Sequence, residues 1–398
     1  MKPLSTVGNI EGFSPPRLLT KHFGRRLRPG NPLTALLTDS FSLSDSMLTG
    51  EWTALAERLG ATPFVRPEWV AAWWRAFGAG ELKILTLRRN GRLVGLLPVA
   101  RRHGCISSLT NYHTPQSELL AEDAGVAYRL AQTVFAGNPR RICLAGLPVR
   151  GAGLNACRRA ATEAGYQTWV HPYQTSPYLK IEGSWERYET RPGSSSQAAG
   201  LRRSLRRLSR QGRVSMDIVS GDERLSEALQ RAFAVESLSW KGAQRAAIQS
   251  RPETTRFYTD IARWAAARGT LRLFFLRLDR QPLAMLYALE EHSVCHLLKS
   301  GYDMRYRQFS PGSLLMRSVA EHCFAMGLRS VEFHGDAEPY KLYWTTNAHR
   351  LKRFDAFSPS LRGRLSAAVH VHARQAARFL LHSVGRRRCV HEHDHIES

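Results

Sequence analysis

The residues of this sequence with the clearest chemical potential lead into Ser310-Pro311-Gly312-Ser313. Serine is a favoured N-cap and proline a favoured first residue of a helix, so a helix is expected to begin here. A helix N-terminus presents unpaired N–H groups and the positive end of the helix dipole, and Gly312 has no Cβ to keep an anion away. We therefore expect a phosphate or pyrophosphate to be held by Arg305, Arg307, Gln308, Ser310, Gly312 and Ser313.

Ser-Pro-Gly-Ser also begins ordinary helices, so the neighbouring elements have to decide between the two interpretations. Leu315, Val319 and Cys323 recur at helical spacing after the turn. Residues 294–303 before it and residues 330–333 after the helix have the composition of strands. The order strand, anion-binding turn, helix, strand favours a functional site in an α/β domain.

A helix followed by a hairpin occurs twice in the sequence. In the first copy, two β-rich runs flank Asn90-Gly91, the strongest short-range signal for a hairpin. The second copy aligns with the first at a constant offset of 189 residues, which takes Leu82 to Leu271. Residues 190–197 have the composition of a linker. Chance similarity is the alternative, and we interpret the pattern as a duplicated α/β unit.

Two helical patterns combine an apolar stripe with many arginines. In residues 198–212 the stripe consists of Leu201, Leu205 and Leu208, and the remaining surface holds Arg202, Arg203, Arg206, Arg207 and Arg210. A second pattern spans residues 361–384, with Leu361, Leu365, Val369 and Leu380 on one face. This second segment either associates with an anionic surface or docks its apolar face on the protein's own core.

The composition predicts an anionic partner. Lys and Arg number 57 against 33 Asp and Glu, a formal net charge of +24, which suits nucleic acid, phosphorylated small molecules or an acidic membrane surface. A generally arginine-rich composition is the alternative. The six scattered cysteines predict reduced thiols in a cytoplasmic protein, and the alternating histidines near the C-terminus do not predict a metal site. We expect neither a signal peptide nor a membrane-spanning segment.

The order and spacing of these elements resemble the GNAT acyltransferase superfamily, specifically its CelD-like branch, found with bacterial cellulose and exopolysaccharide genes. That branch is in turn similar to the FemX-like peptidoglycan aminoacyltransferases. The resemblance covers about residues 40–355. It is carried by Asn111-Tyr112-His113-Thr114-Pro115, the arginines of 202–210, Ser239-Trp240-Lys241, Tyr302-Asp303, Ser310-Pro311-Gly312, Leu314-Leu315, Gly335-Asp336, Tyr340-Lys341 and Trp344.

The resemblance implies direct transfer of an acyl group from a CoA thioester, such as acetyl-CoA, to an amine, without a metal or a covalent enzyme intermediate. The strand around Leu298-Lys299-Ser300 would pair with the pantetheine arm of the donor. Such chemistry needs a base for the attacking ammonium and an acid for the departing thiolate. Candidates implied by the resemblance are Asp336 or Glu332 as base, Tyr340 as acid, and Trp240, Lys241 and Lys341 as substrate-binding residues. Asp336 could instead only cap the turn beside Gly335.

Two departures from the family pattern concern the donor site. The pyrophosphate loop of the family usually reads Gln/Arg-x-x-Gly-x-Gly/Ala, whereas residues 307–312 contain a single glycine, Gly312. In the first half, the offset of 189 places Asp123 at the position of Gly312, within an acidic segment. We therefore expect the first half to be a degenerate partner that helps to form the acceptor cleft.

These observations predict a tandem, duplicated GNAT-like α/β fold with mixed sheets flanked by helices and the donor site in the second half. The expected parts are a basic tail (1–31), a degenerate GNAT-like half (32–189), an acyltransferase half (190–357) and a basic amphipathic C-terminal segment (358–398).

The leading functional hypothesis is an N-acyltransferase that uses a CoA thioester and acts on an anionic or amino-sugar acceptor in envelope polysaccharide metabolism. It would be cytoplasmic or peripheral at the inner face of the membrane. The positive charge would also suit FemX-like aminoacyl transfer from tRNA, although no separate nucleic-acid-binding motif or coiled-coil arm supports it. A catalytically inactive scaffold at the membrane surface is the non-enzymatic alternative.

Overall fold

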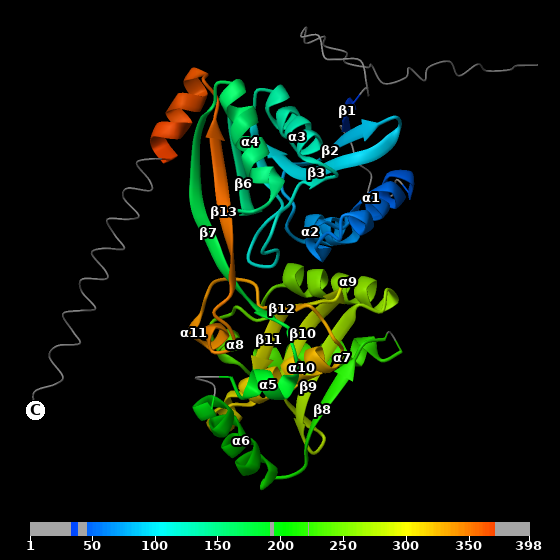
Figure 1. Cartoon of the computed structure of the whole chain (residues 1–398), viewed down its shortest axis with the longest axis vertical. Helices are drawn as coiled ribbons and strands as arrows, with labels where there is room; N and C mark the ends of the chain where they lie inside the picture. Colours follow the sequence, from blue (N-terminus) through cyan, green and yellow to red (C-terminus); the bar gives the residue numbers. More distant parts are fainter. Residues whose placement is uncertain (1–32, 39–45, 192–194, 222, 371–398) are drawn as a thin grey trace, which may run out of the picture. The chain divides into compact units, whose positions relative to one another are not determined.

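The computed structural model describes residues 33–38, 46–191, 195–221 and 223–370 (Figure 1). The predicted basic tail (1–31) and the predicted C-terminal segment from residue 371 onward lie outside these ranges.

The first half supplies the N-terminal strands and helices. They are β1 (Leu33–Thr38), α1 (Ser46–Arg58), η1 (Pro63–Val65), α2 (Pro67–Phe77), β2 (Glu81–Arg89), β3 (Arg92–Arg102), β4 (Cys105–Ser108), β5 (Leu120–Ala121), α3 (Ala124–Ala136), β6 (Arg141–Pro148), α4 (Ala152–Glu163), β7 (Gln167–Lys180) and α5 (Trp185–Glu189).

The second half repeats the alternation of helices and strands. Its elements are α6 (Ser195–Ser209), β8 (Val214–Val219), α7 (Leu225–Ser237), α8 (Trp240–Ala243), η2 (Ile248–Ser250), α9 (Pro252–Ala267), β9 (Leu271–Leu278), β10 (Gln281–Glu291), β11 (Val294–Tyr302), η3 (Met304–Phe309), α10 (Pro311–Ala325), β12 (Ser330–Glu332), α11 (Pro339–Leu342) and β13 (Ala348–Phe357).

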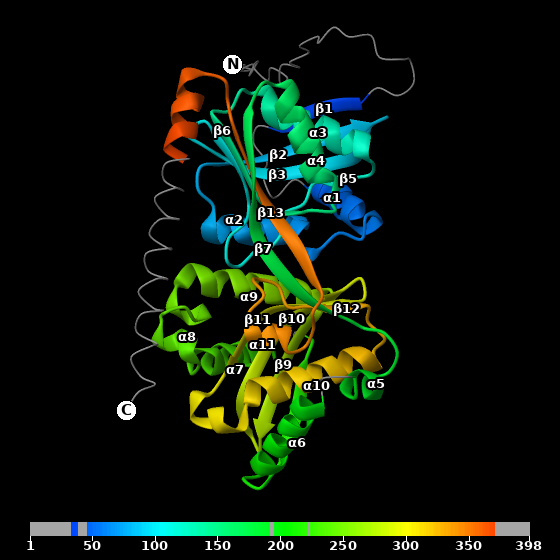
Figure 2. The same ribbon diagram turned by 60° about the vertical axis from the view of Figure 1, so that its left-hand side comes forward.

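The described strands form one mixed sheet in the order β1-β2-β3-β4-β6-β13-β7-β12-β11-β10-β9-β8, with β5 beside β3. The last strand, β13, lies between β6 and β7 and pairs antiparallel with both. The end of β7 pairs in turn with β12. Figure 2 shows β7 and β13 side by side along the path that connects the halves. The predicted α/β fold with a mixed sheet flanked by helices is confirmed.

The position of β13 corrects one expectation from the sequence. We assigned residues 190–357 to the second half, but the pairing places the last strand of that range in the sheet of the first half. Strand pairing between segments so distant in sequence has no local signal, because it depends on which edges the folded halves leave open.

The predicted duplication is visible in two matching hairpins. The β2–β3 turn has Asn90 and Gly91 at φ values of 53° and 79°, as a two-residue type I′ turn requires. The β9–β10 turn has Asp279 at 52°, at the offset of 189 residues from Asn90. The hairpin and the constant offset predicted from the sequence are therefore confirmed.

The two halves share one hydrophobic core. Helices α1 and α2 of the first half pack with α7 and α9 of the second. Trp52 and Trp69 are fully buried there, and the rings of Trp69 and Phe257 meet edge to face with centroids 5.2 Å apart. A buried side chain of this kind contributes roughly 1.5–3 kcal/mol or more. On the opposite face of β9–β11, α10 and α6 build a second core.

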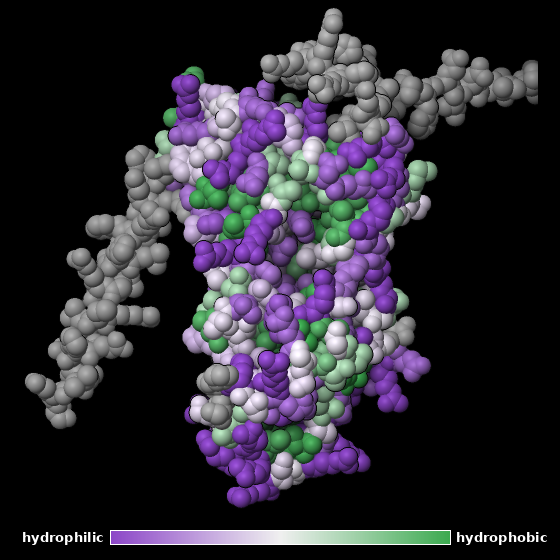
Figure 3. Space-filling view, in the orientation of Figure 1, coloured by the Kyte–Doolittle hydropathy of each residue, from purple (hydrophilic) through white to green (hydrophobic). Residues whose placement is uncertain are grey.

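Helix α6 has the predicted division between an apolar stripe and a basic surface. Leu201 and Leu208 are buried and Leu205 is partly buried. The guanidinium of Arg207 lies 5.4 Å from the ring centroid of Phe309, which places α6 beside η3. Figure 3 shows much of the surface at the lower end of the view, where α6 lies in Figure 1, as hydrophilic.

The structure contradicts one of the two predictions made for the C-terminal segment, namely that its apolar face docks on the core. Residues 361–370 form a helix, but Leu361, Leu365 and Val369 are 79 %, 68 % and 69 % exposed. Docking of these residues on the protein's core is therefore wrong, because Ala367 makes the buried contact instead. The predicted stripe residue Leu380 lies outside the described residues. No helix within the described ranges is long and apolar enough to cross a membrane.

Candidate active site

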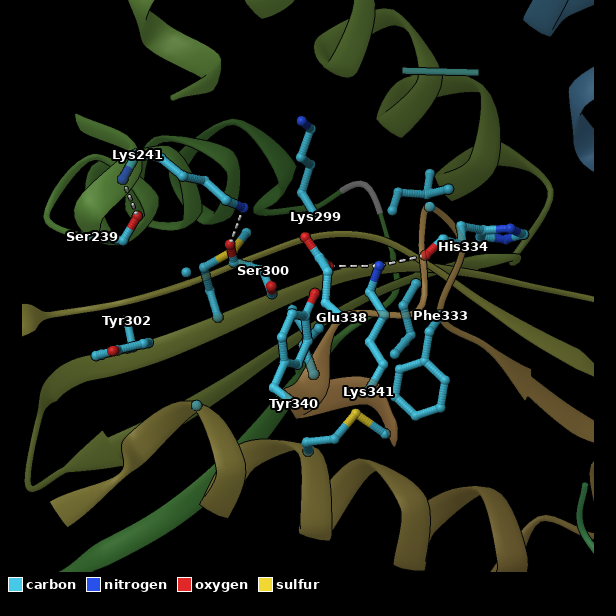
Figure 4. Close-up of a pocket in the computed structure, with 18 of the residues that line it drawn as sticks. Ser239, Lys241, Lys299, Ser300, Tyr302, Phe333, His334, Glu338, Tyr340 and Lys341 are labelled. Atoms are coloured by element: carbon cyan, nitrogen blue, oxygen red, sulfur yellow. Dashed lines mark hydrogen bonds and ion pairs between the residues drawn. The ribbon is translucent and has the colours of Figure 1, made fainter. Parts of the chain in front are cut away.

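A cavity of about 560 Å³ lies in the second half and is closed on one side by the first half. Its walls are β11, the start of α10, helix α8, and the turn between β12 and α11 (Figure 4). The first half adds Tyr112, His113 and Pro115 from one loop and Gln174 from β7. The cavity thus contains both the predicted anion-binding turn and the predicted proton-transfer segment.

The N-terminus of α10 opens into this cavity. Ser310 is the N-cap, as predicted, but its backbone is left-handed (φ 52°, ψ 49°) and its side chain makes no capping hydrogen bond. Glycine adopts this conformation most readily. Ser310 therefore occupies the first glycine position of the family's loop in the conformation that a glycine would supply. Ser310 thus has the positive φ that glycine adopts most readily, at the position where the family pattern has a glycine.

At Gly312 the space for a side chain is limited by the protein itself. A Cβ at this position would lie 3.2 Å from Cδ1 of Tyr302, which is tighter than nearly all real contacts of this kind. Gly312, Ser313, Ser310 and Arg307 all line the cavity. The structure therefore brings together four of the six residues predicted to hold the anion.

The other two predicted anion ligands do not line the cavity. Arg305 is held by Asp303, through Nε and Nη2 at 3.0 and 2.6 Å from the carboxylate oxygens. This hydrogen bond lowers the pKa of Asp303, so the pair is fully charged at neutral pH. Gln308 is also absent from the cavity wall. Arg305 is not available as an anion ligand because Asp303, the N-cap of η3, forms an ion pair with its guanidinium.

Strand β11 has an open edge inside the cavity. Among the described residues it pairs with β12 only over Val294–His296, and Leu297–Tyr302 line the cavity beyond that point. The register of β11 against β10 shifts between Tyr287 and Ala288, next to the point where the pairing of β11 with β12 ends. An unpaired edge offers backbone N–H and C=O groups to an extended ligand. Lys241 already donates to one of these carbonyls, Ser300 O, at 2.6 Å.

The two carboxylates predicted as base candidates have different surroundings. Asp336 is exposed and lines the cavity, and its Oδ1 accepts a hydrogen bond from the backbone of Thr175 in β7 at 3.3 Å. Glu332 lies outside the cavity wall. Its carboxylate contacts Ser330 at 3.0 Å and His349 at 3.2 Å. Successive side chains of a strand point to opposite faces, and the side chain of Glu332 contacts β13 instead of the site.

Tyr340, the predicted acid, lines the cavity and is labelled in Figure 4. Desolvation, followed by the negative charge of Glu338, raises the pKa of Tyr340. The phenol therefore keeps its proton at neutral pH and is available as a donor. Trp240, predicted to bind substrate, also lines the cavity and is 48 % exposed.

Lys341 and Lys241 line the cavity but are committed to protein groups. The ammonium of Lys341 donates to His334 O at 2.6 Å and Asp336 O at 3.0 Å, and pairs with Glu338 at 2.8 Å. It therefore holds the turn that carries Asp336. Desolvation lowers the pKa of Lys241, which contacts Glu236 at 3.5 Å as well as the carbonyl on β11. Neither lysine has a free ammonium group in the structure, so the substrate-binding role predicted for them is not supported.

Sequence reasoning missed Lys299, although it named the strand that carries it. Lys299 is 5 % exposed and lines the cavity, with its nitrogen 4.3 Å from the ring centroid of Tyr112. Sequence also missed His113, whose ring stacks on Phe77 and whose Nδ1 lies 3.2 Å from the hydroxyl of Tyr258. Desolvation lowers the pKa of His113 to about 3. The available signals were the strand segment Leu298-Lys299-Ser300 and the segment Asn111–Pro115, but neither assigned a role to these side chains.

A left-handed turn into a helix, beside an open strand edge, agrees with the order of elements expected from the sequence. Residues 195–342 match the family model described as Acetyltransferase (GNAT) domain. The second half therefore carries a GNAT domain. None of the curated proteins compared with the chain matches it.

Two solved structures have a similar fold. FemX aligns at 11 % identity and a TM-score of 0.54, covering 77 % of this chain and 95 % of FemX. The C-terminal domain of an Agrobacterium fabrum protein, described as a lysylphosphatidylglycerol synthetase, aligns at 10 % identity and a TM-score of 0.50. That alignment covers 82 % of this chain and 96 % of the domain. At these identities the similarity concerns the fold alone.

Proposed function

We propose that the chain is an N-acyltransferase that moves an acetyl or longer acyl group from a CoA thioester to an amine. One observation carries the proposal: the open edge of β11 leads, within one cavity, to the helix N-terminus at Ser310. An extended pantetheine arm needs backbone partners of this kind, and a pyrophosphate needs free N–H groups and no Cβ. The GNAT domain match supports the same donor.

The donor's pyrophosphate would contact the backbone of Gly312 and Ser313, with Arg307 supplying positive charge. The pantetheine arm would pair with β11, where it competes with Lys241 for Ser300 O. The acyl carbon would then lie near the bulge of β11, between the two faces of the cavity.

Proton transfer is assigned to Asp336 and Tyr340. The acceptor's ammonium loses a proton to Asp336, and its nitrogen forms a C–N bond with the thioester carbon. The C–S bond then breaks, the departing thiolate takes a proton from the Tyr340 hydroxyl, and the second proton of the newly acylated nitrogen passes to the Tyr340 phenolate, which leaves a neutral amide and restores the phenol. Asp336 is preferred over Glu332 because only Asp336 lines the cavity.

The acceptor would enter from the side of the first half, between Trp240 and the loop that carries Tyr112. An amine or amino sugar of envelope polysaccharide metabolism is proposed from the CelD-like resemblance. The exposed apolar stripe of residues 361–370, with Arg362 and Arg364 beside it, is compatible with peripheral contact to an anionic membrane.

A second candidate is aminoacyl transfer from tRNA. Helix α6 presents its arginines beside η3, at the donor end of the cavity, where a polyanion would lie. FemX shares the fold. Inactive scaffolding is the third possibility, in which the cavity binds a donor without turnover.

Calorimetric titration of CoA and of total tRNA into the purified chain distinguishes these candidates. We expect CoA to bind stoichiometrically and to be displaced by acetyl-CoA, with tRNA binding weakly and losing affinity steeply as salt rises. Release of free thiol from acetyl-CoA in the presence of primary amines then separates an enzyme from a scaffold. Tight tRNA binding together with no CoA binding would overturn the proposal in favour of the second candidate.

A further inference from the structure

Lys299 is a buried cation whose nitrogen faces a cavity. It lies on β11 opposite Tyr287, which belongs to the core on the α9 side of the sheet. Cross-strand neighbours share a face, so Lys299 projects to the side that α9 and the first half cover. Helix α10, with the proposed pyrophosphate site, covers the opposite face. Lys299 therefore belongs to the acceptor side of the strand.

The three lysines that line the cavity differ in their partners. Lys341 and Lys241 each donate to backbone carbonyls and contact a carboxylate. Within the described part of the chain, Lys299 has no hydrogen-bond acceptor and no ion-pair partner. Its nitrogen lies over the rings of Tyr112 and Tyr258, at 4.3 and 5.5 Å from their centroids. Figure 4 draws Lys299 without any dashed interaction.

Leaving a buried ammonium without an acceptor is costly. Desolvation, together with the positive charge of Lys241, lowers the pKa of Lys299 to about 7, and Glu236 opposes the shift. The other titratable groups near it are the two tyrosines and His113, which desolvation keeps neutral at pH 7. The carboxylate of Glu236 is engaged by Lys241 and by the backbone of Ile248, and neither the tyrosines nor His113 supplies the anion that a charged Lys299 needs.

We propose that Lys299 binds an anionic group of the acceptor, so that the substrate amine also carries a phosphate or a carboxylate. This inference rests on the proposed function and specifies its substrate class. An incoming anion would supply the missing acceptor and hold Lys299 in its charged form. The rings of Tyr112 and Tyr258, over which the nitrogen lies, would add cation–π attraction to the charged form.

Paired probes test this inference without any acyl donor. O-phosphoethanolamine against ethanolamine, and glycine against methylamine, differ by an anionic group in each case. We expect the parent chain to bind the anionic member about 10- to 100-fold more tightly, the range for hydrogen bonds to charged groups. Calorimetry at pH 8 in two buffers of different ionisation enthalpy should show proton uptake on binding, because free Lys299 is then mostly neutral.

Three variants assign the effect. Lys299→Met should lose both the preference for the anionic probes and the proton uptake. Lys299→Arg should keep a preference but lose the uptake, because arginine stays charged at pH 8. Lys180→Met, at the exposed end of β7 where the side chain pairs with Glu182, should behave as the parent does. Thermal melts establish that each variant is folded.

Equal affinity of the parent for both members of each pair would overturn the inference, as would a preference that survives in Lys299→Met. The second result would move the anion site to Lys241. CoA titration of the same samples keeps the two proposals apart. Failure to bind CoA with the anion preference intact would contradict the donor, while normal CoA binding without the preference would contradict only the role of Lys299.

Discussion

The N-termini of α3 and α10 occupy corresponding places in the two halves and are capped in opposite ways. Asp123 caps α3 from extended backbone, and its carboxylate accepts from the backbone of Val126 at 2.8 Å. It also pairs with Arg89 at 2.8 Å. Ser310 caps α10 from left-handed backbone without a side-chain hydrogen bond. The first half thus caps its helix N-terminus with a carboxylate, and the second half leaves its helix N-terminus without a side-chain cap.

The strands β4 and β11, which correspond at the offset of 189 residues, also differ between the halves. β4 has four residues and β11 has nine. In the first half the chain leaves the sheet after Ser108, and the following segment supplies Tyr112 and His113 to the cavity of the other half. At the offset of 189 residues, Tyr112 corresponds in sequence to Gly301, which lies on the open edge of β11. The segment that forms an open strand edge in one copy therefore forms a loop in the other copy, and both line the same cavity.

Placing a carboxylate in the first turn of α10, as the offset of 189 residues suggests from Asp123, should have the largest effect. Gly312→Asp adds a carboxylate where the donor's pyrophosphate would lie, and like charges in contact cost several kcal/mol. We expect CoA affinity to fall by about 100-fold or more, measured by calorimetry, with the melting temperature near that of the parent because aspartate suits a helix N-terminus. Gly312→Ala is the matched control: its Cβ meets Tyr302 at 3.2 Å, so it should lose less. Parental CoA affinity in Gly312→Asp would mean that the glycine only begins the helix.

The next variants change the proposed proton-transfer residues, all of which belong to the second half. Asp336→Asn and Tyr340→Phe should each lower kcat by about 10²–10⁴-fold while CoA binding stays near normal. Glu332→Gln, outside the cavity, should retain most activity. Steady-state thiol release from acetyl-CoA measures all three. If Glu332→Gln alone is inactive, the assignment of the base to Asp336 is wrong.

The two arginines of η3 provide a smaller contrast. Arg307 lines the cavity, whereas Arg305 is bound by Asp303. Arg307→Ala should weaken CoA binding by about tenfold, and more at low salt than at high salt because the interaction is screened. Arg305→Ala should change the affinity by less than about twofold. Titrations at two ionic strengths distinguish the variants, and equal losses would show that the pairing with Asp303 does not persist when the donor binds.

Removing the cap of α3 tests the first half, with the smallest expected effect. Asp123→Ala should lower the free energy of unfolding by about 1 kcal/mol and should leave CoA affinity unchanged. Hydrogen bonds from Arg89 and from the backbone of Val126 lower the pKa of Asp123. Its stabilisation is therefore present above the ordinary carboxyl pKa and is lost as the pH falls through the lower folded-state pKa. Urea unfolding of parent and variant at neutral and acidic pH checks this, since their difference should shrink on acidification.

Features with a local cause were predictable from the sequence. The turn at Asn90-Gly91 follows from residues that tolerate positive φ, and the stripe of α6 follows from helical periodicity. The start of α10 at Ser310 followed from cap and proline preferences. The offset of 189 residues correctly placed Asp123 at a helix N-terminus, although the two caps are two residues out of strict register.

Features that depend on which segments meet in space were decided by the tertiary structure alone. Pairing of β13 with β6 and β7 joins residues that are far apart in the chain. Arg305 and Lys341 carry the positive charge expected of residues that bind an anion. In the structure, however, Arg305 pairs with Asp303 and Lys341 donates to the carbonyl of His334. Lys299 could be recognised as a candidate site residue only from the fold, which buries it beside Tyr112 and gives its nitrogen no hydrogen-bond acceptor among the described residues. Sequence specifies residue types and local backbone preference, whereas burial and partner choice depend on contacts that no local pattern encodes.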